Sequence, residues 1–377
     1  ISETVQADSP PTCISAPAHS TPVQSPLASA SAARADQGQA TAAGAGILSP
    51  GTSIRLEGPM LDLSRAAVDF YPRLIAALAE DGEIDTGFAS PGILFLFRDE
   101  HELERQPSVL AFATERKRSG VNFIGEISAI DSQSARTLFP ALGEVAGAVH
   151  LSGASRVDGR RMRDALHRAT IARGGRMIDA TATIAPSGAI TANGDSIPAD
   201  NVIIAGGAWT PETAAALNHN LAIYPQRGQI LHIDMPDQVT TDWTILHGLS
   251  NHYILTFPKH RVVAGATRED DSGWTYAQTA GGVKSQLDQA LAVAPGLANG
   301  HLVEVRIGFR PASRDGMPFL GQIPGYDHIF VASGHGPGGL QNGPVSGTAI
   351  ANLALGLDPG FDLTPFDPSR PTSSREA

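Results

Sequence analysis

The sequence predicts an α/β protein built from two domains, and three observations lead to this prediction. The chain has 377 residues, and because a domain typically has roughly 150 residues, this length favours two of them. Residues 201–209, NVIIAGGAW, form a short apolar run that ends in glycines, which is typical of a buried strand in a parallel sheet. Residues 301–356 predict a strand, a polar turn, a second strand, a glycine loop and a helix, in that order.

The segment 301–356 also holds the first candidate site residues. Its first apolar run ends on Arg310 and Pro311, and we expect the proline to stop strand pairing and leave the guanidinium free to bind a carboxylate. The loop at residues 333–339, SGHGPGG, permits close approach of a ligand to the backbone, and the helix that follows points free N–H groups toward it. Such a helix end suits an anion or a developing negative charge. The alternative is a surface turn with an ordinary exposed arginine.

The remaining elements follow from the spacing of apolar residues and from turn residues. Two of the strands flank the turn PKHR and predict a β-hairpin. Asp158 is expected to cap the start of a further helix, because its carboxylate can accept from the first N–H groups. The predicted helices are residues 61–80, 99–119, 132–139 and 345–355, and the predicted strands are residues 93–97, 176–184, 201–209, 252–255, 262–267, 302–309 and 328–332.

The composition argues against several classes of partner and site. The chain has 27 Lys+Arg against 38 Asp+Glu and a net charge of −11, which argues against nucleic acid as a partner. Cys13 is the only cysteine, so we expect neither an internal disulfide framework nor a cysteine-based metal cluster. No apolar run approaches the roughly 18 residues that a membrane span needs, and we expect a cytoplasmic protein without such a span. A homo-oligomer stays an open alternative.

Two C-terminal motifs carry a resemblance to a known family. GFRPASRDGMPFLG at residues 308–321 and ASGHG at residues 332–336 resemble the C-terminal signature of the flavin-dependent D-amino acid oxidase, glycine oxidase and sarcosine oxidase superfamily. The resemblance runs from about Asp36 to the end of the predicted helix near Gly356. It implies a Rossmann-like FAD-binding domain made of residues 1–87, 142–217 and 301–377, and a smaller, mostly antiparallel β-sheet substrate domain made of residues 88–141 and 218–300.

The resemblance also implies FAD as the cofactor and the residues that contact it. Because Cys13 is the only cysteine, the covalent link through a C-terminal cysteine of some sarcosine oxidases is impossible, and we expect non-covalent binding. Asp36 stands where relatives hold the adenosine ribose with an acid. For Trp209 a packing role stays open, and His335 is expected to hold its loop or tune the flavin. The other implied contacts are Arg310; Ala43, Gly44, Ala45, Gly46 and Ile47; Thr183; Ala205, Gly206 and Gly207; and Gly334, Gly336, Pro337, Gly338, Gly339 and Leu340.

The same resemblance places the substrate beside Tyr253 and Arg310. The predicted hairpin resembles the wall of the family's substrate pocket, where a tyrosine at the position of Tyr253 hydrogen-bonds the substrate carboxylate. A lone tyrosine in a strand is otherwise most often a packing residue. With Arg310 it would fix the carboxylate so that the α-carbon gives a hydride to the flavin. The products would be an imino acid and then a keto acid and ammonia, with oxygen or another acceptor taking the electrons. Arg227, in the motif YPQRGQ, is expected either to cap a carbonyl or to lie near the flavin.

The N-terminus leaves three functions open. Residues 1–40 are rich in Ser, Pro and Ala, and they lack the GxGxxG turn with which relatives hold the FAD phosphates. An out-of-frame reading of the coding region or a loss of flavin binding would explain this. The chain is therefore expected to be an oxidase or dehydrogenase of glycine or small D-amino acids, an oxidase of secondary amines such as sarcosine or proline-like compounds, or a relative without flavin chemistry.

Overall fold

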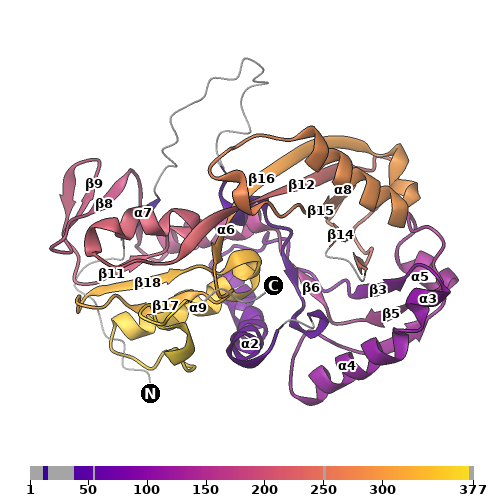
Figure 1. Cartoon of the computed structure of the whole chain (residues 1–377), viewed down its shortest axis with the longest axis horizontal. Helices are drawn as coiled ribbons and strands as arrows, with labels where there is room; N and C mark the ends of the chain where they lie inside the picture. Colours follow the sequence, from indigo (N-terminus) through magenta and orange to yellow (C-terminus); the bar gives the residue numbers. More distant parts are fainter. Residues whose placement is uncertain (1–11, 16–37, 54–55, 249–251, 373–377) are drawn as a thin grey trace.

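The largest element of the protein is an eight-stranded sheet (Figure 1), seen in a computed structural model that describes residues 12–15, 38–53, 56–248 and 252–372. Its neighbouring strands are antiparallel except for β13 and β3, which are parallel. From one edge to the other the strands are β16 (His301–Ser313), β12 (Ile223–Asp234), β15 (Arg261–Gly265), β14 (Tyr253–Thr256), β13 (Ile245–His247), β3 (Ile93–Phe97), β5 (Gly147–Leu151) and β4 (Ile127–Ile130).

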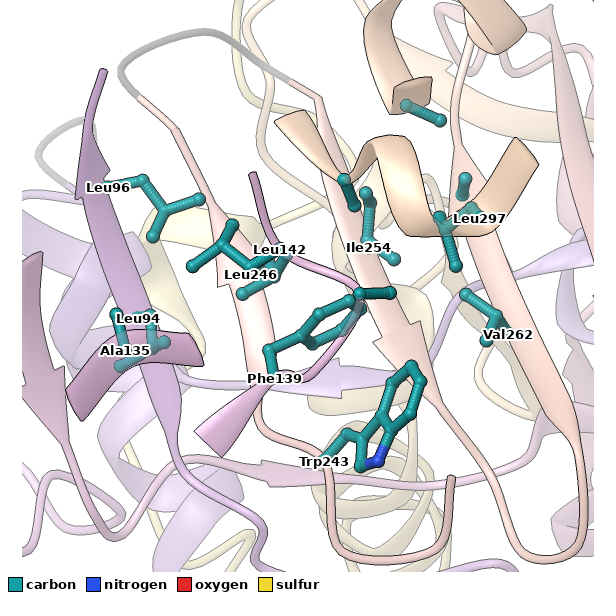
Figure 2. Packing of buried hydrophobic residues seen from close by; sticks show 14 of the residues in the cluster. Leu94, Leu96, Ala135, Phe139, Leu142, Trp243, Leu246, Ile254, Val262 and Leu297 are labelled. Carbon is teal, nitrogen blue, oxygen red and sulfur yellow. The ribbon is translucent and has the colours of Figure 1, made fainter. Parts of the chain in front are cut away.

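Two helices, α5 (Ser132–Leu138) and α8 (Ala280–Val293), contribute residues to a hydrophobic core on one face of this sheet (Figure 2). Every residue of β3 is buried, since the strand lies inside the sheet between β13 and β5. Leu94 and Leu96 alternate with residues of the opposite face and therefore enter the same core as Phe139 and Trp243, whose ring centroids are 4.9 Å apart. The predicted strand at residues 93–97 is thus confirmed.

A second, three-stranded sheet is formed by β11, β18 and β17, and helices α2 (Gly58–Glu80) and α9 (Gly339–Ala354) pack beside it (Figure 1). The hydroxyl of Tyr71 in α2 donates to the carbonyl of Leu340 and thereby fixes the start of α9. The strands are β11 (Val202–Ile204), β18 (Ile329–Ser333) and β17 (Phe319–Gln322), and smaller sheets are formed by β1 (Thr12–Ser15) with β7 (Arg176–Asp179), by β2 (Ile47–Leu48) with β6 (Ser155–Arg156), and by β10 (Asp195–Ile197), β9 (Ile190–Ala192) and β8 (Ala182–Ile184).

Helix α6 (Gly159–Ala172) is tied to the eight-stranded sheet through its N-cap residue, Asp158. The carboxylate of Asp158 accepts from the backbone N–H groups of Arg160 and Arg161, at 3.0 and 3.2 Å, which confirms the predicted N-cap. The same carboxylate forms an ion pair with Arg261 of β15, so the start of α6 is tied to the eight-stranded sheet. None of the described helices is both long and apolar enough to cross a membrane.

Several predicted boundaries differ from the structure. The helix expected at residues 99–119 is two helices, α3 (Glu100–Leu103) and α4 (Gln106–Arg118), because a proline in the first turn of α4 starts a new helix. The strand expected at residues 176–184 is likewise split into β7 and β8. The run at residues 201–209 pairs in parallel with β18, as predicted, but it is a strand only over β11. It is not fully buried: Ile203 is 40% exposed because β11 lies at the edge of its described sheet.

Strand β16 corrects the expectation that Pro311 ends pairing. The strand continues to Ser313, and Pro311 lies directly opposite Pro225 of β12. The pairing of β12 with β15 begins at Ile230 and an isolated bridge joins Arg227 to Glu269, but at Pro225 the only strand paired with β12 in the described sheet is β16. Neither proline therefore has a further strand to which it must donate a hydrogen bond, and a proline is tolerated at such a position.

The expected division into two domains stays a prediction. Two strands of the eight-stranded sheet, β5 and β16, come from the segments 142–217 and 301–377, which the sequence assigned to FAD binding. Strand β16 thus enters the large sheet, and the chain then continues into β17, β18 and α9 of the other region (Figure 1). One continuous segment therefore connects the large sheet to the glycine loop.

Candidate functional site

Arg310 projects from β16 across the neighbouring strand β12. Its guanidinium lies flat against Gly228, where an added Cβ would come within 2.6 Å of the Nη2 atom. The Nη1 atom donates to the carbonyl oxygen of Thr267 at 3.0 Å, just beyond the end of β15. Glycine at position 228 therefore makes the room that this half-buried arginine needs.

Tyr253 lies close enough to Arg310 that the hydroxyl and the guanidinium each influence the pKa of the other. Tyr253 begins β14 and pairs with Gly265 of β15, which brings it close to Thr267. Burial raises the pKa of the Tyr253 hydroxyl, so this group stays protonated. Burial lowers the pKa of Arg310, but a guanidinium, whose usual pKa is above roughly 12, remains charged at neutral pH. The pair thus offers one cation and one neutral hydroxyl to the same ligand group.

The glycine loop follows β18 and is tied to the segment after β11. The Ser333 hydroxyl donates to the carbonyl of Gly207 at 2.9 Å and accepts from the Thr210 hydroxyl at 2.8 Å. These bonds bring the predicted contacts Gly206 and Gly207 against the start of the loop that contains Gly334. Ala205 precedes them directly and is exposed.

His335 is held in the loop by α9. Its Nε2 atom lies 3.0 Å from the hydroxyl oxygen of Ser346, and that hydroxyl already donates its proton to the carbonyl of Asn342 at 2.8 Å. The imidazole must therefore donate through Nε2. Burial lowers the pKa of His335 to about 4, so the ring is neutral at neutral pH. This geometry agrees with the expectation that His335 holds the loop.

The small residues at positions 43–47 lie against the same loop and the same strand. Gly46 has φ +84°, and a Cβ there would overlap the carbonyl oxygen of Val157, so only glycine fits. A Cβ at Gly44 would come within 2.7 Å of Leu340. Ala43 contacts β16 at Gly308, where an added Cβ would lie 2.6 Å from the Ala43 Cβ.

Further polar contacts fix this arrangement. The backbone N–H of Ser49 donates to Gln341 of α9 at 3.1 Å, and Arg306 of β16 donates to the carbonyl of Ala42 at 3.2 Å. The segment 43–47, the glycine loop and the strand bearing Arg310 are therefore brought together, although their contact with FAD stays a prediction. Thr183, another predicted FAD contact, is not part of this arrangement in the contacts described above. It lies exposed on β8, with its hydroxyl 2.7 Å from that of Thr191. Asp36 lies outside the described residues.

An aromatic cluster adjoins β16 and includes Trp209. The Trp209 ring stacks on that of Trp274 with centroids 4.6 Å apart, and Phe309 meets Trp274 edge-on at 5.2 Å. This stacking supports the packing alternative for Trp209, and its contact with FAD stays a prediction. Phe309 directly precedes Arg310 in β16, and because side chains alternate along a strand, the cluster lies on the face opposite Arg310.

The loop at residues 266–279 contains site residues that the sequence did not single out. Arg227 of β12 donates to Glu269 at 3.0 Å and to the carbonyl of Thr275 at 2.9 Å, so it caps a carbonyl, while a position near the flavin stays a prediction. Gln229 donates to the Glu269 carboxylate at 2.7 Å. The loop also contains Thr267, which was predicted to end a hairpin strand, and Arg268, which directly follows that predicted strand.

Comparisons with known proteins agree with this geometry. A family model described as "FAD dependent oxidoreductase" (DAO) matches residues 32–353. The uncharacterized oxidoreductase YurR of Bacillus subtilis is 36% identical over 341 residues, which cover 89% of this chain and 91% of YurR.

Two crystal structures extend the likeness to the fold. Iminodiacetate oxidase (IdaA) from Chelativorans sp. BNC1 is 32% identical, with a TM-score of 0.84, and the match covers 88% of this chain and 90% of that one. Glycine oxidase from Geobacillus kaustophilus is 26% identical, with a TM-score of 0.77, covering 89% and 90%. These likenesses confirm the expected α/β fold, in which a mixed sheet is combined with a mostly antiparallel one.

Proposed function

Because the chain belongs to the FAD dependent oxidoreductase family (DAO), we propose that it oxidises the Cα–N bond of glycine or a small D-amino acid. The observation that carries this proposal is the proximity of Arg310 and Tyr253, which lie beside the glycine-rich segments. A fixed cation and a neutral hydroxyl together suit a carboxylate, which both α-amino acids and N-substituted glycines contain.

The described part of the site fits the ring of a flavin. A Cβ at Gly207, Gly336 or Gly343 would meet no atom within 4 Å, so these backbone positions face open space that a flat ring could approach. The N-terminus of α9, at Gly339, supplies free N–H groups, which favour a negatively charged ligand. Asp36, which was predicted to hold the adenosine ribose of FAD, lies outside the described residues. We propose non-covalent binding, since the chain has a single cysteine, Cys13.

The residues of this chain would bind and orient the substrate. Arg310 and Tyr253 would fix the carboxylate, and fixing it leaves the α-carbon a restricted set of positions. Tyr253 keeps its proton, because burial raises its pKa, and can donate it to a carboxylate oxygen. The neutral His335 adds no positive charge that would repel an amine close to the loop.

The overall reaction balances as a two-electron oxidation. FAD, when bound, accepts a hydride from the α-carbon. The amine nitrogen loses a proton, water adds to the resulting imino acid, and the amine leaves to give a keto acid and ammonia. Oxygen, which becomes hydrogen peroxide, or another acceptor takes the two electrons.

A secondary amine is the second candidate substrate. The specific observation in its favour is that this chain is 32% identical to iminodiacetate oxidase, compared with 26% for glycine oxidase from Geobacillus kaustophilus, over similar coverage. In a secondary amine the nitrogen has two carbon substituents, so the same C–N oxidation releases a primary amine in place of ammonia.

The first experiment is the absorbance spectrum of the purified full chain with and without added FAD. We expect flavin bands near about 375 and 450 nm, as for other protein-bound flavins. Glycine, D-alanine, sarcosine and iminodiacetate are then added under argon, and loss of the band near about 450 nm identifies the substrate class. A chain that retains no flavin, or whose flavin none of these compounds reduces, refutes the proposal.

A further inference from the structure

His247 ends strand β13 and lies directly opposite Tyr253, the first residue of β14. Two residues paired in this way lie on the same face of a sheet, with Cβ atoms about 4.5–5.5 Å apart. On its other side His247 pairs with Phe95 of β3, and the centroids of these two rings are 5.3 Å apart. The imidazole therefore lies in one row with Phe95 and Tyr253 across the large sheet.

The same face of the sheet carries the small-residue segment that is expected beside the flavin. Ala45 and Ile47 of that segment pack against a hydrophobic cluster that contains Phe95, and Tyr253 packs against the same cluster. The half-buried His247 therefore lies on the flavin side of the sheet, next to a residue that is expected to bind the substrate carboxylate.

One hydrogen bond fixes the tautomer of the His247 ring. Its Nδ1 atom lies 2.7 Å from the carbonyl oxygen of Gly248, and because a carbonyl only accepts, Nδ1 must carry a proton. Burial lowers the pKa of His247, so the ring is neutral at neutral pH. In such a ring Nε2 is a hydrogen-bond acceptor, and no residue in the described part of the chain donates to it.

A substrate amine needs an acceptor of this kind. Arg310 contains only donors, Tyr253 keeps its proton for the carboxylate, and His335 donates through its own Nε2 to Ser346. An amine presents N–H groups, and an N–H group that loses water without gaining a partner costs free energy. The amine and the carboxylate of an amino acid share one carbon, so their binding residues must be neighbours. Strands β13 and β14 place His247 and Tyr253 at the spacing of adjacent strands, ~4.8 Å.

We propose that His247 accepts a hydrogen bond from the substrate amine through Nε2 while Arg310 and Tyr253 hold the carboxylate. This inference rests on the proposed function, since it assigns a role to a further residue of the same site. His247 would orient the amine and take neither the hydride nor a proton from it. The alternative is a histidine that only packs against Phe95.

The test uses two ligands that contain no amine to oxidise, glycolate and propionate. Both carry one carboxylate, but where the amine of glycine would be, glycolate has a hydroxyl donor and propionate has a methyl group. Their dissociation constants are measured by calorimetry on the full chain with FAD added. The ratio of the two constants reports whether an acceptor faces this position.

Two variants of His247 distinguish an acceptor from a packing residue. His247→Phe keeps a ring beside Phe95 but has no acceptor, so the affinity for glycolate relative to propionate should fall roughly threefold to tenfold, the contribution of one neutral hydrogen bond. His247→Gln offers an amide oxygen and should restore part of this preference. An unchanged ratio in His247→Phe overturns the proposal. An equal weakening of both ligands, or no binding of either to the wild type, overturns it as well.

His260 provides the matched control. Its Nδ1 atom also lies 2.7 Å from a backbone carbonyl oxygen, that of Gln238, and the residue is half-buried like His247. It lies in the turn between β14 and β15, at the opposite end of β14 from Tyr253. His260→Phe should therefore leave the affinity ratio unchanged. If the ratio falls in this variant as it does in His247→Phe, the effect is not local to the site and the proposal is overturned.

A second measurement separates this inference from the proposed function. The kcat/KM for sarcosine, whose neutral amine has one N–H group, is measured in the wild type and in both variants of His247. If sarcosine is oxidised and His247→Phe leaves its kcat/KM unchanged, the inference fails while the oxidase function stands. If sarcosine is not oxidised but the preference for glycolate still depends on His247, the oxidase function fails and the acceptor role stands.

Discussion

Replacing Arg310 with leucine should separate substrate binding from folding. The guanidinium makes one protein hydrogen bond, to the Thr267 carbonyl, so the folded chain should lose only about 1 kcal/mol. Burial also lowers the pKa of Arg310, which means that the buried charge itself is unfavourable in the free protein. A substrate carboxylate, in contrast, would lose two charge-assisted bonds worth about 3–5 kcal/mol, or roughly 10²–10⁴-fold in kcat/KM.

The assay is steady-state oxidation over a range of substrate concentrations, together with the flavin spectrum and a urea unfolding curve of each variant. We expect a strongly raised KM, normal flavin content and a nearly unchanged unfolding midpoint for Arg310→Leu. Arg310→Lys keeps the charge but not the two-pronged geometry, and it should recover only part of the loss. An unchanged KM in Arg310→Leu would remove this residue from carboxylate binding.

Three further predictions concern the structure around the site. Gly46→Ala forces a Cβ into a backbone carbonyl and should lower the free energy of unfolding by more than about 3 kcal/mol. Gly194→Ala, which is also at positive φ but faces open space, should lower it by only about 1–2 kcal/mol. Equal urea midpoints for the two variants would contradict the overlap at Gly46. Burial lowers the pKa of His335 from 6.5 to about 4, so its contribution to the free energy of unfolding is complete above about pH 6.5 and is lost as the pH falls. By about pH 5 the loss should be about 2 kcal/mol. His335→Gln should remove that part of the pH dependence. Glu269→Gln leaves the 8%-exposed Arg227 without its ion pair and should cost about 3 kcal/mol, whereas Asp288→Asn, from a pair with exposures of 75% and 61%, should cost less than about 0.5 kcal/mol in the same denaturation assay.

Four strands of the large sheet, β3, β14, β15 and β16, could be predicted from the sequence because their patterns are local, whereas β4, β5, β12 and β13 were not predicted. The hairpin of β14 and β15 follows from two apolar runs around a polar turn, and the helix cap at Asp158 follows from one residue type before a helix. The end of β16 could not be predicted, since Pro311 is tolerated only because its pairing with β12 leaves no further strand to which it must donate. That pairing depends on a strand more than 80 residues away, counted roughly along the chain.

In the candidate site, too, some residues could be predicted from the sequence and others could not. The family resemblance pointed to Arg310 and Tyr253, and the structure places the two side chains in contact. Gly228 carried no signal, because a missing side chain has meaning only once the register puts Arg310 across it. Arg268 was not singled out for a related reason: an arginine in a polar loop is typical of a solvated surface, and its neighbourhood is set by how β12, β15 and β16 pair.

Strand β16 has a consequence for the precision of the reaction. It touches Ala43 of the small-residue segment at Gly308 and bears Arg310 two residues later, so the two points lie on one face about 7 Å apart along a single strand. The strand thus fixes the distance between the small-residue segment expected beside the flavin and the arginine expected to bind the carboxylate. The distance between two residues of one strand is set by covalent geometry. Small movements of the neighbouring strands and helices should therefore leave the expected spacing between the substrate α-carbon and the flavin ring almost unchanged.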